Sequence, residues 1–271
     1  MKSKQLVAMA ALALLVALPA RAAEVVSSNI VGYEKITVPV NAQNIIGIQF
    51  QNVGVNGALA LQDIVPEKGE NGEGYSGEGV DWIKIYNPAT SRYTTAYYWG
   101  VEAEGGVYES ADAEEALGPG WGDENQNVMD VDLLAGQGVW TQAEAGGKLI
   151  VAGEVTAGNT VTVPANAMTL VANPLPMLVS LQLIVPTGYS GEGVDWIKIY
   201  NPATSRYVTA YYWGVEAEGG VYESADAEDP LGPGWGDENQ TVINVDIAVG
   251  QGFWTQAEDG GTLTFPAIPA E

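Results

Sequence analysis

Two groups of aromatic residues have the composition of platforms on which sugar rings stack. Their members are Tyr86, Tyr93, Tyr97, Trp99, Tyr200, Tyr207, Tyr211 and Trp213. Tyrosine and tryptophan serve such platforms because they offer large, stiff and amphipathic faces. The alternative is that these residues fill the core and form cross-strand pairs, since the chain has only three Phe for packing. The sequence favours the core and leaves a glycan-binding platform open.

The acidic residues suggest a second chemistry, cation binding. Residues 123–127 match the opening of an EF-hand calcium loop, but Val128 and Leu134 replace the glycine and the glutamate that such a loop requires. A loosely bound calcium ion at Asp123, Asp130 and Asp132 remains open, because calcium accepts oxygen ligands in irregular geometry. We expect no other cofactor.

Paired carboxylates could also perform glycoside hydrolysis, which needs two acids about 5–10 Å apart. Glu78 with Asp81, or Glu102 with Glu104, are candidate pairs. With 34 acidic residues, however, such pairs arise by chance. The chain also contains no His and no Cys, which argues against Ser-His-Asp and Cys-His nucleophiles and against ordinary zinc or haem ligation. The sequence therefore predicts a protein that is not an enzyme.

The first residues have the pattern of a secretory signal. Lys2 and Lys4 precede an apolar run, Leu6 to Leu18, and Ala20-Arg21-Ala22 offers a small-x-small cleavage site. We therefore expect export through the Sec pathway to a secreted or extracellular location, with the periplasm or the cell surface also open. No second apolar run approaches the roughly 20 residues of a membrane span, so we expect no membrane insertion.

The charge of the chain restricts its partners. Removal of the predicted signal leaves 10 − 3 = 7 basic residues against 34 acidic ones. Binding to a phosphate backbone needs clustered Lys and Arg, which seven scattered cations cannot provide, so we expect no nucleic acid. Self-association and extracellular glycan remain as partners.

An internal repeat positions all of these residues. Residues 74–147 recur as residues 188–261 with eleven differences, and each copy contains four of the eight Trp. Upstream the match is weaker, as in Ile36–Pro39 against Val161–Pro164. The repeat predicts a duplicated module of about 110–120 residues, an ordinary domain size.

Within a module, short alternating apolar runs predict strands. Three strand pairs are predicted: Asp81–Tyr86 with Arg92–Trp99, Gly138–Gln142 with Lys148–Val151, and Thr160–Val163 with Met168–Ala172. Period two places Tyr97 and Trp99 on one face of their strand and Tyr98 on the other. Long acidic and Gly-rich segments are predicted to be loops.

We therefore predict an all-β fold of two tandem β-sandwich or barrel-like modules, which arose by internal duplication and follow a cleaved signal peptide. The predicted boundaries are residues 1–22 for the signal peptide, 23–35 for an N-terminal strand segment, 36–152 for the first module, 153–160 for a linker and 161–271 for the second module. Segment 24–40 is apolar and β-prone, so it either pairs within its own module or adds to a neighbour's sheet edge.

Four segments carry a resemblance to a known family, namely Val25–Tyr33, Leu170–Leu175, Gly136–Trp140 and Gly250–Trp254. They resemble a family of uncharacterised secreted β-repeat proteins of the Planctomycetes–Verrucomicrobia group. The resemblance implies export, a β-sandwich-like fold and no catalytic motif. The first copy departs from it, with Ile48-Gln49-Phe50 where the second has Asn173-Pro174-Leu175.

The function predicted from the sequence is that of a secreted, non-catalytic structural or interaction protein, such as a cell-surface, matrix or fibre component. The alternative is an extracellular pair of glycan-binding modules that use the Tyr and Trp platforms. A carboxylate-dependent glycosidase comes third.

Overall fold

The computed structural model describes residues 31–52, 57–67, 74–100, 106–155, 160–214 and 219–268. The predicted signal peptide and positions 23–30 of the predicted N-terminal segment lie outside the described residues. Within these ranges the regular elements are strands and two 3-10 turns, η1 (Leu61–Asp63) and η2 (Leu181–Leu183), and there is no α-helix. The predicted all-β class is therefore confirmed.

The first half of the chain forms two larger sheets and one strand pair. One sheet joins β1 (Val31–Val38), β11 (Gly147–Val155) and β3 (Phe50–Gln51), with β5 (Val65–Glu67) also paired to β11. The other has the order β2 (Asn44–Gly47), β10 (Gly138–Gln142), β6 (Glu78–Asn87), β7 (Arg92–Trp99) and β8 (Gly120–Gly122). The strand pair is β4 (Leu59–Ala60) with β9 (Asp132–Leu133).

The second half repeats this arrangement with shorter outer strands. One sheet joins β12 (Thr160–Val163), β21 (Gly261–Thr264) and β15 (Val185–Thr187). The other has the order β13 (Thr169–Ala172), β20 (Gly252–Gln256), β16 (Glu192–Asn201), β17 (Arg206–Trp213) and β18 (Gly234–Gly236). The strand pair is β14 (Val179–Ser180) with β19 (Asp246–Ile247).

The four larger sheets are arranged like the blades of a four-bladed propeller. Apolar side chains fill the space between neighbouring sheets. In the first half, Ile36 and Leu149 of one sheet join Ile83 and Val139 of the other in a single buried cluster. The second half has an equivalent cluster around Phe253, and a third cluster lies between the two halves.

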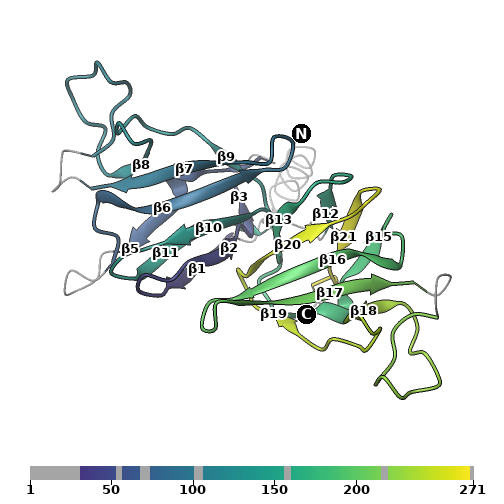
Figure 1. Cartoon of the computed structure of the whole chain (residues 1–271). Coiled ribbons are helices and arrows are strands. Elements are labelled where there is room, and N and C mark those ends of the chain that lie inside the picture. The colour runs from purple at the N-terminus through teal and green to yellow at the C-terminus, as the bar shows by residue number, and fades with distance from the viewer. Residues whose placement is uncertain are drawn as a thin grey trace, which may run out of the picture. The chain divides into compact units, whose positions relative to one another are not determined.

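The predicted hairpin of residues 81–99 is confirmed. Strands β6 and β7 pair antiparallel with Ile83 opposite Ala96, and β16 and β17 pair in the same way (Figure 1). The register shifts between Glu78 and Trp82, so that part of β6 bulges away from β7. Alternation along β7 places Tyr98 and Tyr97 on opposite faces, as predicted, and the structure shows that Tyr98 is the one that packs against the core.

The other two predicted strand pairs are wrong. Strand β10 pairs with β2 and β6, whereas β11 pairs with β1, β3 and β5, so these consecutive strands belong to different sheets. Likewise β12 pairs with β21 and β13 with β20. The physical reason is that each connection crosses the core, so that Val139 and Leu149 cover the same apolar cluster from two sides.

Two strands cross the boundaries predicted for the modules. Strand β1 continues through position 35 and pairs with β11 from Val31 opposite Glu154 to Val38 opposite Gly147. Strand β11 in turn extends past position 152 into the predicted linker. Positions 156–159 of that linker lie outside the described residues. The first half thus includes the part of the N-terminal segment that the structure describes.

Candidate functional site at the junction of the two halves

Aromatic rings from the two halves meet in reciprocal contacts. Tyr86 of β6 packs on Trp254 of β20 with ring centroids 4.9 Å apart and an interplanar angle of 82°. Trp140 of β10 packs on Tyr200 of β16 at 5.2 Å and 64°. The sequence repeat relates the two contacts, since 200 − 86 and 254 − 140 are both 114. The contacts therefore follow the self-complementary pattern of a two-fold symmetric dimer interface.

Two further tyrosines extend this aromatic cluster. Tyr93 packs on Tyr86 with centroids 5.1 Å apart, and Tyr207 packs on its counterpart at 5.2 Å. Burial raises the pKa of Tyr93 and of Tyr207, and this outweighs the hydrogen bonds from the indoles of Trp140 and Trp254. Tyr93 nevertheless keeps 46% of its surface exposed. Four of the eight predicted stacking residues (Tyr86, Tyr93, Tyr200 and Tyr207) thus lie at the junction.

The remaining predicted stacking residues lie farther along the same sheet faces. Tyr97 is half-buried opposite Trp82 in the register of β6 and β7. The indole of Trp99 donates a hydrogen bond to the carbonyl of Asp123 at 3.0 Å. Gly79 lies so close to the Trp99 ring that a Cβ there would overlap it, so one ring face is covered. Tyr211 and Trp213 occupy the equivalent positions in the second half.

Backbone hydrogen bonds also join the halves. The N–H of Gly47 in β2 donates to the carbonyl of Gly250 at 2.7 Å, and the N–H of Ala172 in β13 donates to the carbonyl of Gly136 at 2.8 Å. Strands β2 and β13 are the edges of the two five-stranded sheets. Each edge is therefore covered by the other half, which removes it as a site of unwanted strand pairing.

The centre of the junction is apolar and closely packed. Ile45 and Leu170, from the two edge strands, are 2% and 4% exposed and belong to the same cluster as Trp254. Gly47 faces Ala172 so closely that a Cβ built on Gly47 would overlap the Cβ of Ala172. One glycine is therefore required at this contact.

A half-buried acidic side chain, that of Glu34, lies at one side of the junction. In the orientation that satisfies both groups, the Gln49 amide donates to Oε2 of Glu34 at 2.7 Å and accepts from the N–H of Gly250. Burial raises the pKa of Glu34. Gln49 is 2% exposed, so this chain of contacts links β1 to the second half in a region sheltered from water.

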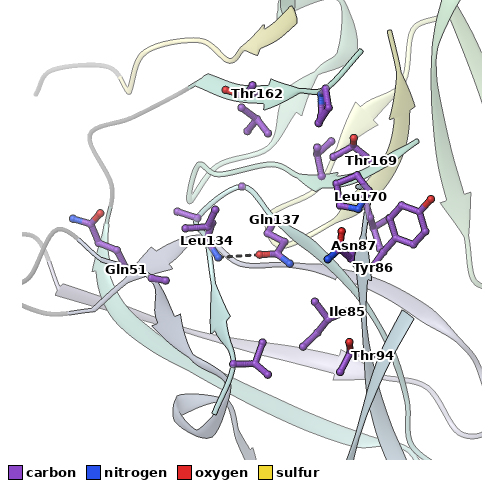
Figure 2. A pocket seen from close by; sticks show the side chains of 18 of the residues that line it. Gln51, Ile85, Tyr86, Asn87, Thr94, Leu134, Gln137, Thr162, Thr169 and Leu170 are labelled. Atoms are coloured by element: carbon purple, nitrogen blue, oxygen red, sulfur yellow. Dashed lines mark hydrogen bonds between the residues drawn. The ribbon is translucent and has the colours of Figure 1, made fainter. Parts of the chain in front are cut away.

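The other side of the junction contains a cavity of about 800 Å³. Residues of both halves line it, among them Tyr86, Gln137 and Leu134 from the first half and Thr162 and Leu170 from the second (Figure 2). Its described lining residues are apolar or neutral and polar, with no acidic or basic side chain. Small-molecule sites in proteins are typically concave and mostly apolar, with a few polar groups, as this one is.

The carboxylates that the sequence offered for catalysis take structural roles or lie outside the described residues. Asp81 is fully buried, and its oxygens accept the backbone N–H groups of Ser76 at 2.5 Å and Glu144 at 2.7 Å. Glu78, its proposed partner, is exposed on the bulged part of β6. Glu102 and Glu104 lie outside the described residues. The Asp81 carboxylate thus ties two loops together.

The candidate calcium ligands are not brought together. Among the described residues, no three acidic side chains are grouped as a metal site requires, so Asp123, Asp130 and Asp132 do not form one. Desolvation raises the pKa of Asp123, but hydrogen bonds from Asn127 and Asn125 outweigh it and hold the pKa below its usual value. The Asp123 carboxylate therefore stabilises its own loop.

Sequence reasoning missed the junction itself. Trp140, Trp254 and Glu34 were not among the predicted site residues, and of the residues that line the cavity only Tyr86 was. The motif Gly-x-Gly-x-Trp at Gly136–Trp140 and Gly250–Trp254 was the available signal, because it supplies both the tryptophans and the closely approaching glycines of the junction.

Comparison of the chain with protein-family models, with curated proteins and with solved structures finds no match. The predicted resemblance to secreted β-repeat proteins therefore stays a prediction. Within the part of the chain that the structure describes, no helix is long and apolar enough to cross a membrane.

Proposed function

We propose that this chain is a secreted, non-catalytic structural or interaction protein, a component of a cell surface, a matrix or a fibre. The observation that carries the proposal is the structural use of the polar groups that could do chemistry. Asp81 and Asp195 each accept two backbone N–H groups, and Asp123 closes its own loop. This structural use of the candidate carboxylates supports a non-catalytic role.

The surface best placed for contact is β1, through its unpaired edge and the exposed side chains on its outer face. Among the described strands β1 pairs only with β11, so one of its edges is open. Val31 and Tyr33 on this strand are 60% and 71% exposed. Lys35 pairs with Glu67 at 2.6 Å beside them, and a charge on an edge strand limits uncontrolled association. A second copy of the chain is the partner that such an edge accepts.

The proposal includes the history and processing of the chain. The two halves are proposed to be tandem sandwich-like modules from an internal duplication, released by cleavage of the signal at residues 1–22. The repeat of residues 74–147 and the matched strand orders of the halves support the duplication.

Sedimentation velocity over a range of protein and salt concentration tests the self-association. We expect larger species as protein concentration rises, and more of them in salt, which screens the repulsion of an acidic chain. The Val31→Lys/Tyr33→Lys variant should weaken the association. Leu117→Lys, at a position 63% exposed outside the strands, is the control and should not. Monomers under every condition would contradict the assembly role.

The second candidate function is glycan binding by the sheet faces. The observation that favours it is the half-exposed row formed by Trp82, Lys84 and Tyr97, in which the Lys84 ammonium lies 4.2 Å from the centroid of the Trp82 ring. The second half repeats the row. A glycan array with the native protein and with Tyr97→Ala/Tyr211→Ala separates the two functions, because only the glycan-binding function predicts a signal that this variant removes.

A further inference from the structure

The cavity at the junction has the size and lining of a ligand site. Its volume of about 800 Å³ lies within the range of about 300–1,000 Å³ typical of small-molecule sites. None of its described lining residues is charged, although the chain has a net charge of −24. The negative field of the protein disfavours an anionic ligand, and the lining offers no carboxylate to pair with a cation. The chemistry of the cavity therefore selects a neutral molecule.

Two amide side chains of the lining are held in fixed orientations. The Asn87 oxygen accepts the N–H groups of Ala89 at 3.0 Å and Thr90 at 3.3 Å, and the Gln137 oxygen accepts the N–H of Leu134 at 3.0 Å. Because the oxygens are engaged, the NH₂ groups remain as donors. No described residue accepts a hydrogen bond from either nitrogen, and Figure 2 shows both amides at the cavity.

The rest of the lining combines threonine hydroxyl groups with aliphatic side chains. Thr94 and Thr162 provide hydroxyls that both donate and accept. Leu134, Leu170 and Ile85 provide the apolar part (Figure 2). Fixed amide donors and hydroxyls beside aliphatic surface match a molecule with a polar rim and apolar ring faces. We propose that the cavity binds a neutral saccharide.

The equivalent residues on the other side of the junction show what makes this cavity distinct. Asn201 and Gln251 have the same local hydrogen bonds, with Ala203 at 3.0 Å and Ala248 at 2.9 Å. Gly250, the counterpart of Gly136, lies against the Glu34 carboxylate, whereas Gly136 lines the cavity beside Val161. Glu34 thus places a carboxylate on the side of the junction that contains Gly250, whereas no charged described residue lines the cavity on the other side.

The inference deepens the proposed interaction role, and it stands whether or not the chain assembles. Isothermal titration calorimetry of the full mature chain tests it, with neutral tetrasaccharides of glucose and of N-acetylglucosamine and with tetragalacturonate as the charged probe. We expect saturable binding of at least one neutral probe, with one site per chain. Tetragalacturonate should bind at least tenfold more weakly.

Matched variants locate the site. Asn87→Ala/Gln137→Ala should weaken binding of the neutral probe at least tenfold, while Asn201→Ala/Gln251→Ala, which removes equivalent local hydrogen bonds, should leave it within twofold. Thr162→Trp on β12 should block the cavity without removing a hydrogen bond. The matched control is Thr37→Trp, at the equivalent position of β1 in the first half.

Three outcomes overturn the inference. They are no binding of any neutral probe, unchanged binding by both cavity variants, and equal binding of tetragalacturonate. Two sites per chain, lost in Tyr97→Ala/Tyr211→Ala, would place the ligand on the sheet faces instead. Failure of the cavity inference is thus distinguishable from failure of the assembly role, which sedimentation tests.

Discussion

At several positions where their sequences agree, the two halves of the chain make equivalent hydrogen bonds. Asp81 and Asp195 are both fully buried, and each accepts two backbone N–H groups at 2.5 and 2.7 Å. The indoles of Trp121 and Trp235 each donate to a carbonyl just after a 3-10 turn, at 2.7 and 2.9 Å. Matched residues thus build matched interiors.

One difference between the halves lies where they meet. Gly47 of the first half faces Ala172 of the second, and these two residues occupy equivalent positions beside Gly138 and Gly252. Two second halves in this arrangement would bring Ala172 against Ala172, and their Cβ atoms would overlap. The junction therefore accommodates one first half and one second half, and not two second halves, although its aromatic contacts are reciprocal.

The largest expected effect is the loss of stability when Asp81 or Asp195 is removed, and it tests whether the interiors of the two halves are equivalent. Asp81→Ala and Asp195→Ala each leave two buried N–H groups without an acceptor, so each should lower the free energy of unfolding by about 3–6 kcal/mol, at about 1.5–3 kcal/mol per charge-assisted bond. Urea denaturation measures both losses. Values that differ by more than about 2 kcal/mol would break the equivalence of the halves.

Alkaline unfolding tests the same equivalence through the tyrosines. Burial raises the pKa of Tyr75 and of Tyr189 well above the usual value near 10, despite hydrogen bonds with Thr141 and Thr255 that lower it. The folded protein therefore retains protons that the unfolded chain releases, and stability falls as pH rises above 10. Each tyrosine should contribute a slope of about 1.4 kcal/mol per pH unit.

Circular dichroism combined with tyrosinate absorbance follows this transition. One cooperative loss of structure is expected, since both halves carry the same buried tyrosine. Two separated transitions would show that the halves differ in their interiors after all.

Double-mutant cycles sharpen the reciprocity of the junction. Tyr86→Ala with Trp254→Ala, and Tyr200→Ala with Trp140→Ala, should each give a coupling energy of about 0.5–1.5 kcal/mol in urea denaturation, as aromatic pairs do. Tyr86→Ala with Trp235→Ala, whose rings lie in different clusters, is the control and should be additive within about 0.5 kcal/mol. Coupling in one cross-junction pair alone would contradict the reciprocal arrangement.

The smallest expected effect concerns the side of the junction that carries an acid. The folded state raises the pKa of Glu34 through burial, so this group favours the folded state below its unfolded pKa of about 4.5 and loses that contribution as pH rises through the folded pKa. Glu34→Gln mimics the protonated acid. It should raise the melting temperature slightly at pH 7 relative to the native chain and leave it unchanged at pH 4.

A rise of equal size at both pH values in calorimetry would show that the effect is not a titration of Glu34. Asn159, the residue equivalent to Glu34 in the upstream repeat, lies outside the described residues.

The local structure was predictable from sequence, and the long-range structure was not. Alternation from Asp81 to Trp99, with the turn at Asn87, was enough to predict the β6–β7 hairpin and to place Tyr98 on the face opposite Tyr97. The sheets that β10 and β11 join depend on partners distant in the sequence, such as Val31 opposite Glu154, and an alternating pattern carries no information on them.

The prediction of the candidate site from the sequence failed for a related reason. Alternation shows that Tyr86 and Tyr93 point away from the core of their own half. It does not show whether they face solvent or the second half, because amphipathic aromatic residues suit both environments. The Gly-x-Gly-x-Trp motif, which contains Gly138 and Gly252, was the signal that marked the contact, but glycines in strands have several other causes.

Exchange of the two small residues at the junction tests its geometry most directly. Gly47→Ala alone should lower the free energy of unfolding by about 1–3 kcal/mol or more, because the added methyl group overlaps Ala172. The exchanged variant, Gly47→Ala/Ala172→Gly, restores one glycine and one alanine, and the strand cost of about 0.5–1 kcal/mol for glycine merely changes sides. It should therefore recover to within about 1 kcal/mol of the native chain. A harmless Gly47→Ala, or an exchanged variant no more stable than Gly47→Ala, would contradict a junction in which these two strands meet face to face.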